Sequence, residues 1–370
     1  MSLRLEPRNE PTLALLILAP VAAVTATLIA GAVMMGLLGR PPLEALYVYF
    51  VSPLTDAYTR AEVVVKMVPL ALMGAGLAVG FRANVWNIGA AGQYTFGALI
   101  AGAMALQFPG ELTGLHWLAM YLIVGTLAGM AWAAIPAFLR TRFGTNEILV
   151  TLMLTYVAAL MLDWAVRGPL RDPAGFGFPQ SRDFPDAFIM PVLMPGTRLH
   201  AGLLIAVPVA LGLGLMLARM RQGYALRVLG AEPRAGAFAG FERNRSIWFA
   251  LMLSGGLAGL AGAIEVSATV SQLQPEISAE YGFTAIIVAF LGRLNPAGAL
   301  IGATLLALSF IGGENAQIML NMPKNVTALF QGLLLFFLLA ADTLTRYRIR
   351  WTPSPAVATP NAGTAATEDG

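Results

Sequence analysis

The sequence predicts an all-α protein, a polytopic bundle of transmembrane helices with about eight to ten spans. Of its 370 residues, 57% are hydrophobic and 12% are charged, whereas soluble domains carry about 25% charged residues. Disorder requires low hydrophobicity and high net charge, and the net charge here is only +3. Because a spanning helix needs about 20 apolar residues, the chain is long enough for such a bundle.

Apolar runs along the chain give the predicted spans in order. The first run, 12–38, carries no charge and is longer than a signal-peptide core, so we expect an uncleaved span. Lys66, near one end of the second run, can snorkel to the interface. The other runs lie at 63–80, 93–107, 118–139, 148–166, 201–218, 247–265, 283–291, 297–311 and 326–341. The short pair 283–291 and 297–311 fits either two spans or a re-entrant loop, which leaves the count between eight and ten.

The placement of arginine orients the bundle, because cytoplasmic loops carry an excess of Lys and Arg. The segment 219–245 holds six Arg against two Glu, so we expect it in the cytoplasm. The loop 167–200 carries four Arg against three Asp and is rich in proline, so we expect it in the periplasm. Counting spans between these loops places both termini in the cytoplasm.

The chain then divides into three parts. We expect a cytoplasmic N-terminus at 1–11, a transmembrane domain at 12–345, and a cytoplasmic, disordered tail at 346–370. The end of the tail is composed mostly of Pro, Ala, Thr and Ser, and such a composition cannot bury a core.

Several kinds of chemistry have no residues to support them. The chain has no cysteine, and its two histidines, His116 and His200, lie in or beside predicted loops. This pattern argues against thiol chemistry, a metal site or a membrane-embedded enzyme, and we expect no cofactor. Neither Lys66 nor Lys324 stands in a Gly-Lys-Ser/Thr motif, so ATP hydrolysis would need another polypeptide. The basic residues are scattered at membrane edges, so we expect no nucleic-acid binding.

The cytoplasmic loop predicts a short helix at 232–241. Pro233 suits the first helical position and Glu232 suits the positive end of the dipole, while Gly240 can stop the helix. Phe238 and Phe241 lie three residues apart among small side chains. Such a helix can dock into a groove of a soluble partner or lie on lipid headgroups, and the residues alone favour neither.

A glycine- and amide-rich segment at 81–93 separates two apolar runs without an ordinary turn sequence. Irregular backbone at membrane depth occurs where it is buried in protein or lines a watery cavity. Asn87 and Gln93 can both donate and accept hydrogen bonds. The segment is therefore either a broken helix facing a solute path or a cytoplasmic turn, which Arg82 would favour.

A run of polar residues begins the next span. Asn146 or Thr145 can cap the helix, and Thr151, Thr155 and Tyr156 follow at helical spacing. These groups can line a solute path or join neighbouring helices by hydrogen bonds.

Three acids, Asp163, Glu265 and Glu314, stand near predicted span ends. An acid inside a membrane is a functional hypothesis by default, but we expect all three near interfaces. Asp163 and Arg167 have the spacing of an ion pair on one helix face.

Four of these stretches carry a family resemblance. Residues 80–93 match a pattern that usually reads Asn-Ile-Gly-Ala-Glu-Gly-Gln, and 146–156 match one that usually has Asn at 155. Residues 167–173 match a loop typical of nucleoside carriers, and 227–240 match a coupling loop. From about 63 to 339, the chain resembles the permease subunits of bacterial ABC importers of the branched-chain amino acid and ribose type. It is most similar to nucleoside permeases that work with basic-membrane-protein lipoproteins.

Two residues depart from the pattern. Ala91 replaces the usual acid, and Glu232 replaces the usual Asn before Pro233. If the missing acid contacts solute in relatives, the substrate here can differ.

The resemblance implies a permease subunit of an ATP-driven importer in the bacterial inner membrane that moves nucleosides by alternating access. A sugar or a branched-chain amino acid is the alternative solute. An ion-coupled secondary transporter is the rival class, but it would need a charge at mid-span. The implied partners are an ABC ATPase, a second homologous permease, a substrate-binding lipoprotein and the lipid bilayer.

These inferences give two candidate sites. The resemblance assigns ATPase coupling to Glu232, Pro233, Arg234, Ala235, Ala237, Phe238, Ala239, Gly240 and Phe241. The polar segments give a candidate translocation path of Asn87, Gly89, Gly92, Gln93, Asn146, Thr151, Thr155 and Tyr156.

Overall fold

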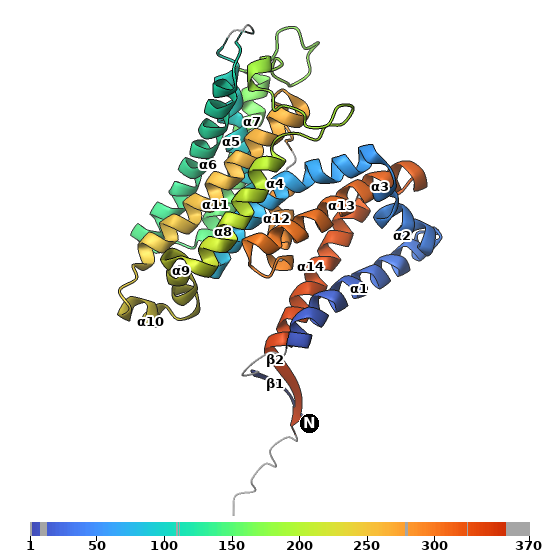
Figure 1. Cartoon of the computed structure of the whole chain (residues 1–370), viewed down its shortest axis with the longest axis vertical. Coiled ribbons are helices and arrows are strands. Elements are labelled where there is room, and N and C mark those ends of the chain that lie inside the picture. Colours follow the sequence, from blue (N-terminus) through green and yellow to red (C-terminus); the bar gives the residue numbers. More distant parts are fainter. Residues whose placement is uncertain are drawn as a thin grey trace, which may run out of the picture.

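The computed structural model describes residues 2–7, 13–108, 110, 112–277, 280–323 and 325–352. Each predicted apolar run forms a helix. These helices are α1 (Leu13–Leu37), α4 (Ala57–Arg82), α5 (Ala90–Ala105), α6 (Leu115–Phe143), α7 (Glu147–Arg167), α8 (Leu203–Arg219), α11 (Arg243–Glu265), α12 (Tyr281–Leu291), α13 (Pro296–Leu320) and α14 (Asn325–Arg346). In Figure 1, α5–α8 and α11 lean together on one side, α1, α2 and α14 lie on the other, and α4, α12 and α13 join them.

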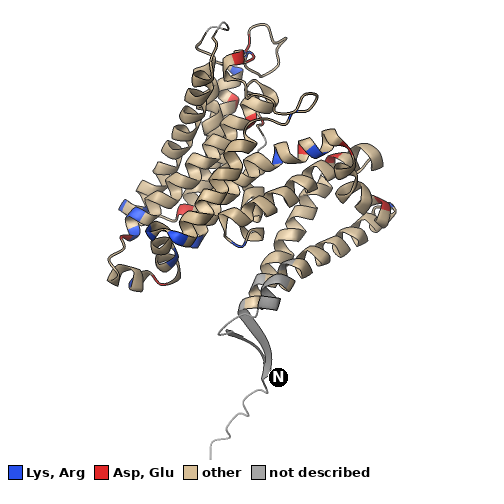
Figure 2. Cartoon of the chain, in the orientation of Figure 1, with Lys and Arg blue, Asp and Glu red and all other residues tan. Residues whose placement is uncertain are grey.

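Short elements connect the long helices. They are α2 (Pro42–Phe50), α3 (Ser52–Thr55), α9 (Arg221–Ala231), α10 (Pro233–Phe238), a 3₁₀ turn η1 (Asp186–Phe188) and a π-helical segment η2 (Val266–Val270). Lys and Arg gather near α9 and α10, and the long middle parts of most helices carry no charge (Figure 2). The basic cluster near α9 and α10 corresponds to the arginine-rich segment 219–245 of the sequence.

The number of clear spans is smaller than the predicted eight to ten. Among the described residues, five helices are long and apolar enough to cross a membrane: Ala57–Arg82, Leu115–Phe143, Glu147–Arg167, Arg243–Val270 and Pro296–Leu320. A sixth results if α8 and α9, bent by 71°, are one span. The 16 residues of α5 and the 11 of α12 rise about 24 and 17 Å, which is less than the roughly 30 Å of a bilayer core.

Helix α4 is the centre of the packing. In its most apolar stretch, 89% of the residues are buried, because α8, α11, α12 and α13 all contact it. Small residues bring the backbones together: a Cβ at Gly76 would lie 3.0 Å from Ser254 Cα, and one at Gly129 would lie 2.2 Å from Gly255 O. Close approach at small residues is the usual means of helix association in membranes.

Two short strands, near the two ends of the described chain, pair beside the helical bundle. Strand β1 (Ser2–Pro7) pairs antiparallel with β2 (Tyr347–Thr352), and Ser2 lies opposite Thr352. Residues 2–7 and 347–352 are thus side by side, and the cytoplasmic location of both termini stays a prediction. The first residues of the predicted disordered tail are therefore paired, and its remainder, 353–370, lies outside the described residues.

The long loop after α7 is tied to the end of α11. Ser181 N donates to Leu273 O at 2.9 Å, Phe184 N donates to Ser271 O at 2.8 Å, and Ser267 Oγ donates to Phe188 O at 2.6 Å. Phe184 and Phe188 are buried in the main core. The loop therefore covers the end of the bundle opposite α9 and α10.

Candidate functional site

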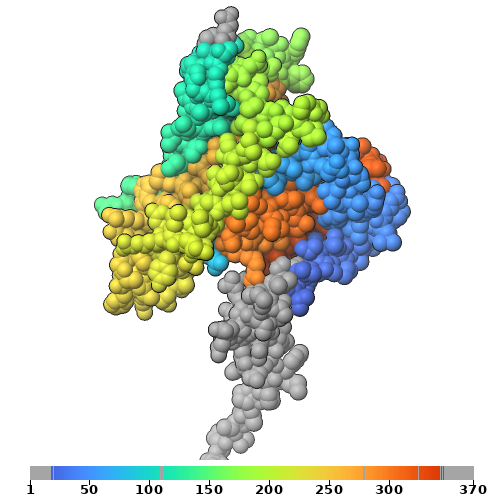
Figure 3. Space-filling view, viewed as in Figure 1, coloured from blue at the N-terminus to red at the C-terminus, as the bar shows by residue number. Residues whose placement is uncertain are grey.

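The predicted cytoplasmic helix is present as α10. It begins at Pro233 and ends at Phe238, and Gly240 follows with a φ of +78°, which favours glycine. Phe238 is 96% exposed, whereas Phe241 packs edge-on against Tyr224, with ring centroids 5.9 Å apart. Residues around α9 and α10 project from the body of the molecule (Figure 3). The helix thus exposes Phe238 to the surroundings, whereas Phe241 is partly covered by Tyr224. The docking role of the helix stays a prediction.

Helix α9 rests directly on the turn that ends α4. A Cβ at Gly230 would lie 2.0 Å from Arg82 O, so only glycine allows this approach. The turn continues through Asn84, whose φ is +54°, to Val85. Gly230 lies in the stretch 227–240 that resembles a coupling loop, but sequence reasoning did not include it among the coupling residues. Gly230 therefore joins the projecting helices to the segment that leads to Asn87.

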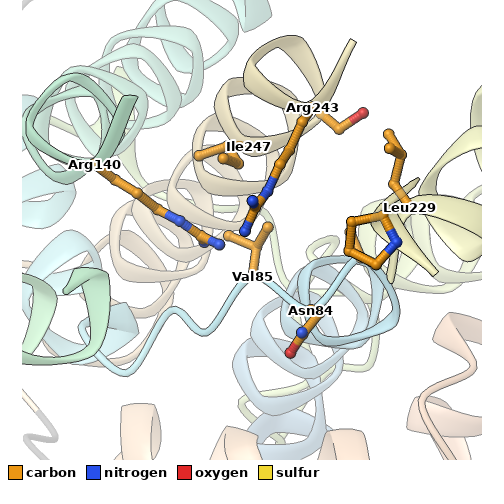
Figure 4. A pocket seen from close by; sticks show the side chains of 9 residues that line it. Asn84, Val85, Arg140, Leu229, Arg243 and Ile247 are labelled. Carbon is orange, nitrogen blue, oxygen red and sulfur yellow. The ribbon is translucent and has the colours of Figure 1, made fainter. Parts of the chain in front are cut away.

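A small cavity of about 20 Å³ lies at this joint, enough for about one water molecule. Figure 4 shows Arg140 and Arg243 reaching toward it from one side, with Leu229 and Asn84 on the other. Pro233, the first residue of α10, also lines it. The predicted coupling helix and the turn after α4 thus share one basic cavity.

An ion pair between α6 and α7 holds the segment after α4 at Trp86. Arg140 of α6 lies 2.5 Å from Glu147 Oε1 of α7, and both side chains are largely buried. Trp86 N donates to the same carboxylate oxygen at 3.3 Å. Sequence reasoning did not single out this pair. Its signal in the sequence was a pair of opposite charges on either side of the turn between two adjacent predicted spans. The pair therefore fixes the start of the irregular segment against α6 and α7.

The amides of the irregular segment are buried and hydrogen-bonded to each other. Asn87 and Gln93 are both 1% exposed. Asn87 Nδ2 donates to Gln93 Oε1 at 2.7 Å and to Ser254 Oγ at 2.9 Å, and Gln93 Nε2 donates to Asn87 Oδ1 at 3.2 Å. Ser254 on α11 is a further member that the sequence did not reveal. The break between α4 and α5 thus has an exposed turn near Asn84 followed by a buried polar cluster.

Helix α7 packs closely against this cluster. A Cβ at Gly89 would lie 2.3 Å from Thr151 O, and one at Gly92 would lie 2.7 Å from Thr155 Cα. Thr151 Oγ1 accepts from Ile88 N at 3.2 Å, and Thr155 Oγ1 donates to Thr151 O at 3.3 Å. The two glycines therefore allow a close contact between the segment and α7, and Thr151 adds a hydrogen bond across it.

The remaining two path candidates lie apart from the cluster. Asn146 caps α7, and its Oδ1 accepts from Ile148 N at 2.9 Å. Tyr156 is 59% exposed on the outside of the helix. The structure therefore groups Asn87, Gly89, Gly92, Gln93, Thr151 and Thr155, and the translocation role of the whole set stays a prediction.

The acids near span ends have different surroundings. Asp163 forms the predicted ion pair with Arg167, at 2.7 Å. Glu314 pairs with Lys66 at 3.2 Å, so Lys66 has an ionic partner in the protein. Glu265, the last residue of α11, is buried in the protein, with only 7% exposure at the start of the π-helical segment. The loop after α7 covers this end of α11, which the span boundaries alone did not reveal.

The same loop contributes two ionisable groups beside α4. Arg198 pairs with the buried Glu62, and this hydrogen bond raises the pKa of Arg198. His200 is 1% exposed, and burial lowers its pKa to about 4, so the imidazole is neutral near pH 7. Gly202 N donates to His200 Nδ1 at 3.2 Å. A neutral, buried histidine therefore stands at the end of the loop, just before α8.

These features define a multi-pass, all-helical membrane protein with a projecting helix pair joined to a buried break between two helices. Residues 59–339 match the family model described as "Branched-chain amino acid transport system / permease component". The chain belongs to this family of ABC permeases, which are transport subunits and not ATPases. The resemblance predicted from four sequence stretches is thus confirmed at the level of the family.

Three relatives are similar over most of their length. The glucose ABC transporter permease protein TsgB13 of Haloferax volcanii is 32% identical over 97% of this chain and 98% of the relative. The guanosine ABC transporter permease protein NupP of Bacillus subtilis is 28% identical over 87% and 92%, respectively. The nucleoside ABC transporter permease protein NupB of Lactococcus lactis is 25% identical over 87% and 90%.

Membership of this class has consequences for partners and location. An ABC importer permease works with an ATPase and a binding protein. The chain is a multi-pass membrane protein. Because one relative is archaeal and others are bacterial, location in a bacterial inner membrane stays a prediction.

Proposed function

We propose that this chain is one permease of an ATP-driven importer that carries nucleosides across the inner membrane of a bacterium. The observation that supports the substrate is similarity over 87% of the chain to permeases named for guanosine and for nucleosides. The importer would also contain an ABC ATPase, a second homologous permease and a substrate-binding lipoprotein.

A sugar is the second candidate solute. The relative named as a glucose permease is 32% identical over 97% of this chain. By sequence identity alone, a free sugar is supported at least as strongly as a nucleoside. Nucleosides and glucose share a neutral ring that carries hydroxyl groups. Both proposals therefore need a path that binds hydroxyl groups without requiring a charge on the solute.

The contacts described above suggest how ATP would drive transport. Helix α10 would dock on the ATPase through the exposed Phe238. Movement of α9 would pass through Gly230 to the turn at Arg82, since the two backbones are in direct contact. The turn continues into Asn87, which is hydrogen-bonded to Gln93 and Ser254. Closure of the ATPase subunits would thus rock α4 and α5 against α7 and α11, giving alternating access.

Ionisable groups inside the spans make the rival class worth testing. The sequence analysis required a mid-span charge for an ion-coupled transporter, and the buried acid Glu265 lies at the end of α11 instead. The family match assigns the chain to ABC permeases, so we expect ATP and not an ion gradient to drive uptake.

The test is uptake by vesicles that contain the complete transporter, with labelled guanosine, adenosine, glucose and leucine compared in parallel. We expect nucleosides to accumulate when ATP is supplied on the cytoplasmic side of the membrane. Accumulation should continue after the proton gradient is collapsed. Accumulation of glucose alone would replace the nucleoside with the second candidate. Loss of uptake on collapsing the gradient, with ATP still present, would contradict the ATP-driven mechanism.

A further inference from the structure

A cavity of about 320 Å³ lies between α4, α12, α13 and α14, apart from the coupling joint and the Asn87 cluster. Its volume is within the range of about 300–1,000 Å³ that is typical of small-molecule sites. Lys66, Tyr281, Phe310 and Glu314 line it. We propose that this cavity is a subsite for the hydroxyl-bearing ring of the transported solute, an inference that rests on the proposed function.

The cavity lies toward the end of the bundle that faces away from the coupling helices. Lys66 is about 24 Å along α4 from Arg82, at a rise of 1.5 Å per residue, and Arg82 contacts α9. The start of α13 lies beside Gly214 near the cytoplasmic end of α8, where a Cβ would be 3.0 Å from Ala297 Cβ. Glu314 stands about 27 Å further along α13. A solute released by a binding protein would enter from this end.

The polar wall offers both donors and acceptors. Lys66 Nζ lies 3.2 Å from Glu314 Oε1 and donates to Tyr281 Oη at 3.3 Å. An ammonium group has three donors and a carboxylate has about four acceptor positions, so both groups retain capacity for a ligand. Gln317 adds an amide whose Nε2 donates to Gly313 O at 3.2 Å. A hydroxyl group, which both donates and accepts, matches this wall.

An aromatic wall stands beside the polar one. The rings of Tyr281 and Phe310 lie with centroids 5.5 Å apart and planes at 69°. Lys66 Nζ is 5.9 Å from the centroid of the Tyr281 ring, so the polar and apolar walls meet at one point. Small-molecule sites commonly combine aromatic surface with a few placed polar groups, and a sugar ring presents both an apolar face and hydroxyl edges.

The charge of the wall selects against anions. Among the described residues that line the cavity, Glu276, Glu280 and Glu314 carry negative charge and Lys66 carries positive charge. Lys66 is already paired with Glu314. A phosphate group would therefore meet an excess of negative charge. The site should accept a neutral nucleoside or sugar and reject its phosphorylated form or an anionic lipid headgroup.

Because the chain has no natural cysteine, one introduced thiol can report on the cavity directly. The experiment uses the complete transporter with Gln317→Cys and follows the rate at which a small water-soluble maleimide labels this chain. Phe178→Cys is the matched control, because Phe178 is 66% exposed on the outer loop and does not line the cavity. Guanosine, glucose and guanosine 5′-monophosphate are added separately as protecting solutes.

We expect guanosine or glucose to slow labelling of Gln317→Cys and not of Phe178→Cys. At about ten times the dissociation constant, labelling should slow about tenfold, because the free fraction of a single site falls as 1/(1 + [L]/Kd). The monophosphate should give no protection at the same concentration. Adding Glu314→Gln should shift protection to higher solute concentration, because the carboxylate that accepts from a solute hydroxyl is removed.

Two results would overturn the subsite. One is a Gln317→Cys thiol that is never labelled, which would mean that water does not reach the cavity. The other is labelling that no solute slows, although the same transporter accumulates that solute. In either case the uptake assay can still succeed, so the proposed function would stand. Conversely, failure of every nucleoside and sugar in the uptake assay would contradict the proposed function itself.

Discussion

Replacement of Gly230 by alanine should separate ATP hydrolysis from transport. The added Cβ would lie 2.0 Å from Arg82 O, so α9 and the turn after α4 must separate by about 1.5 Å to reach normal van der Waals contact near 3.5 Å. Overpacking of this kind costs roughly 1–3 kcal/mol. Because the contact is between two backbones, neither partner can relieve the clash by changing a rotamer.

The assay compares uptake with ATPase activity of the purified, complete transporter in vesicles. We expect Gly230→Ala to assemble with the ATPase but to lose most uptake, since the movement of α9 no longer reaches Asn87 in register. Gly212→Ala is the control: Gly212 is also helical, and its Cβ would have nothing within 4 Å. Alanine there should stabilise the helix by about 0.5–1 kcal/mol and leave uptake unchanged. Normal uptake by Gly230→Ala, with both variants equally abundant, would refute the joint.

Three other substitutions test separate parts of the structure. Phe238→Asp should abolish co-purification with the ATPase, because Phe238 is 96% exposed on α10. Phe241→Asp should in addition loosen the contact with Tyr224 and lower the yield of folded protein. Equal co-purification of Phe238→Asp and wild type would contradict docking. His200→Asn should reduce the sensitivity of the melting temperature to acid. The His200 pKa of about 4 lies below the unfolded value of 6.5, so the stability that neutral His200 allows is complete above pH 6.5 and is lost as the pH falls toward 4. The free energy of unfolding should therefore fall by about 2 kcal/mol at pH 5 through this group. The same acid-induced drop in melting temperature in the variant and in wild type would count against this. Asn87→Ala should leave Gln93 and Ser254 short of a partner, costing about 1–3 kcal/mol, and a melting temperature equal to that of wild type would show that the cluster is not a structural unit.

The helices and the projecting coupling segment could be predicted from the sequence because their signals are local. Apolar runs gave the positions of the long helices, and Pro233 with Gly240 gave the limits of α10. The count of spans was less predictable, since α12 is apolar but has only 11 residues. Composition measures apolarity, whereas the depth that a short helix reaches depends on its neighbours.

Contacts between distant segments could not be read from the sequence. Glu147 was visible as part of a motif, but its pairing with Arg140 and Trp86 N depends on how α6 and α7 meet. Ser254 gave no signal, because one serine among the glycines of α11 looks like a packing residue. The pairing of β1 with β2 joins residues 2–7 to residues 347–352, and six-residue strands have too few positions to show a pattern.

In the mechanism that we propose, the contacts around the segment after α4 make it the part of the chain that ATP would move. From the side of α9, Gly230 lies against Arg82 O. From the bundle side, Glu147 accepts a hydrogen bond from Trp86 N, and Thr151 accepts one from Ile88 N. The segment is therefore held at its start by the coupling helices and along its length by α7. A shift of α9 relative to α7 must strain one set of contacts or carry the segment with it. We therefore propose relative motion of these two helices as the step that opens or closes the Asn87 cluster.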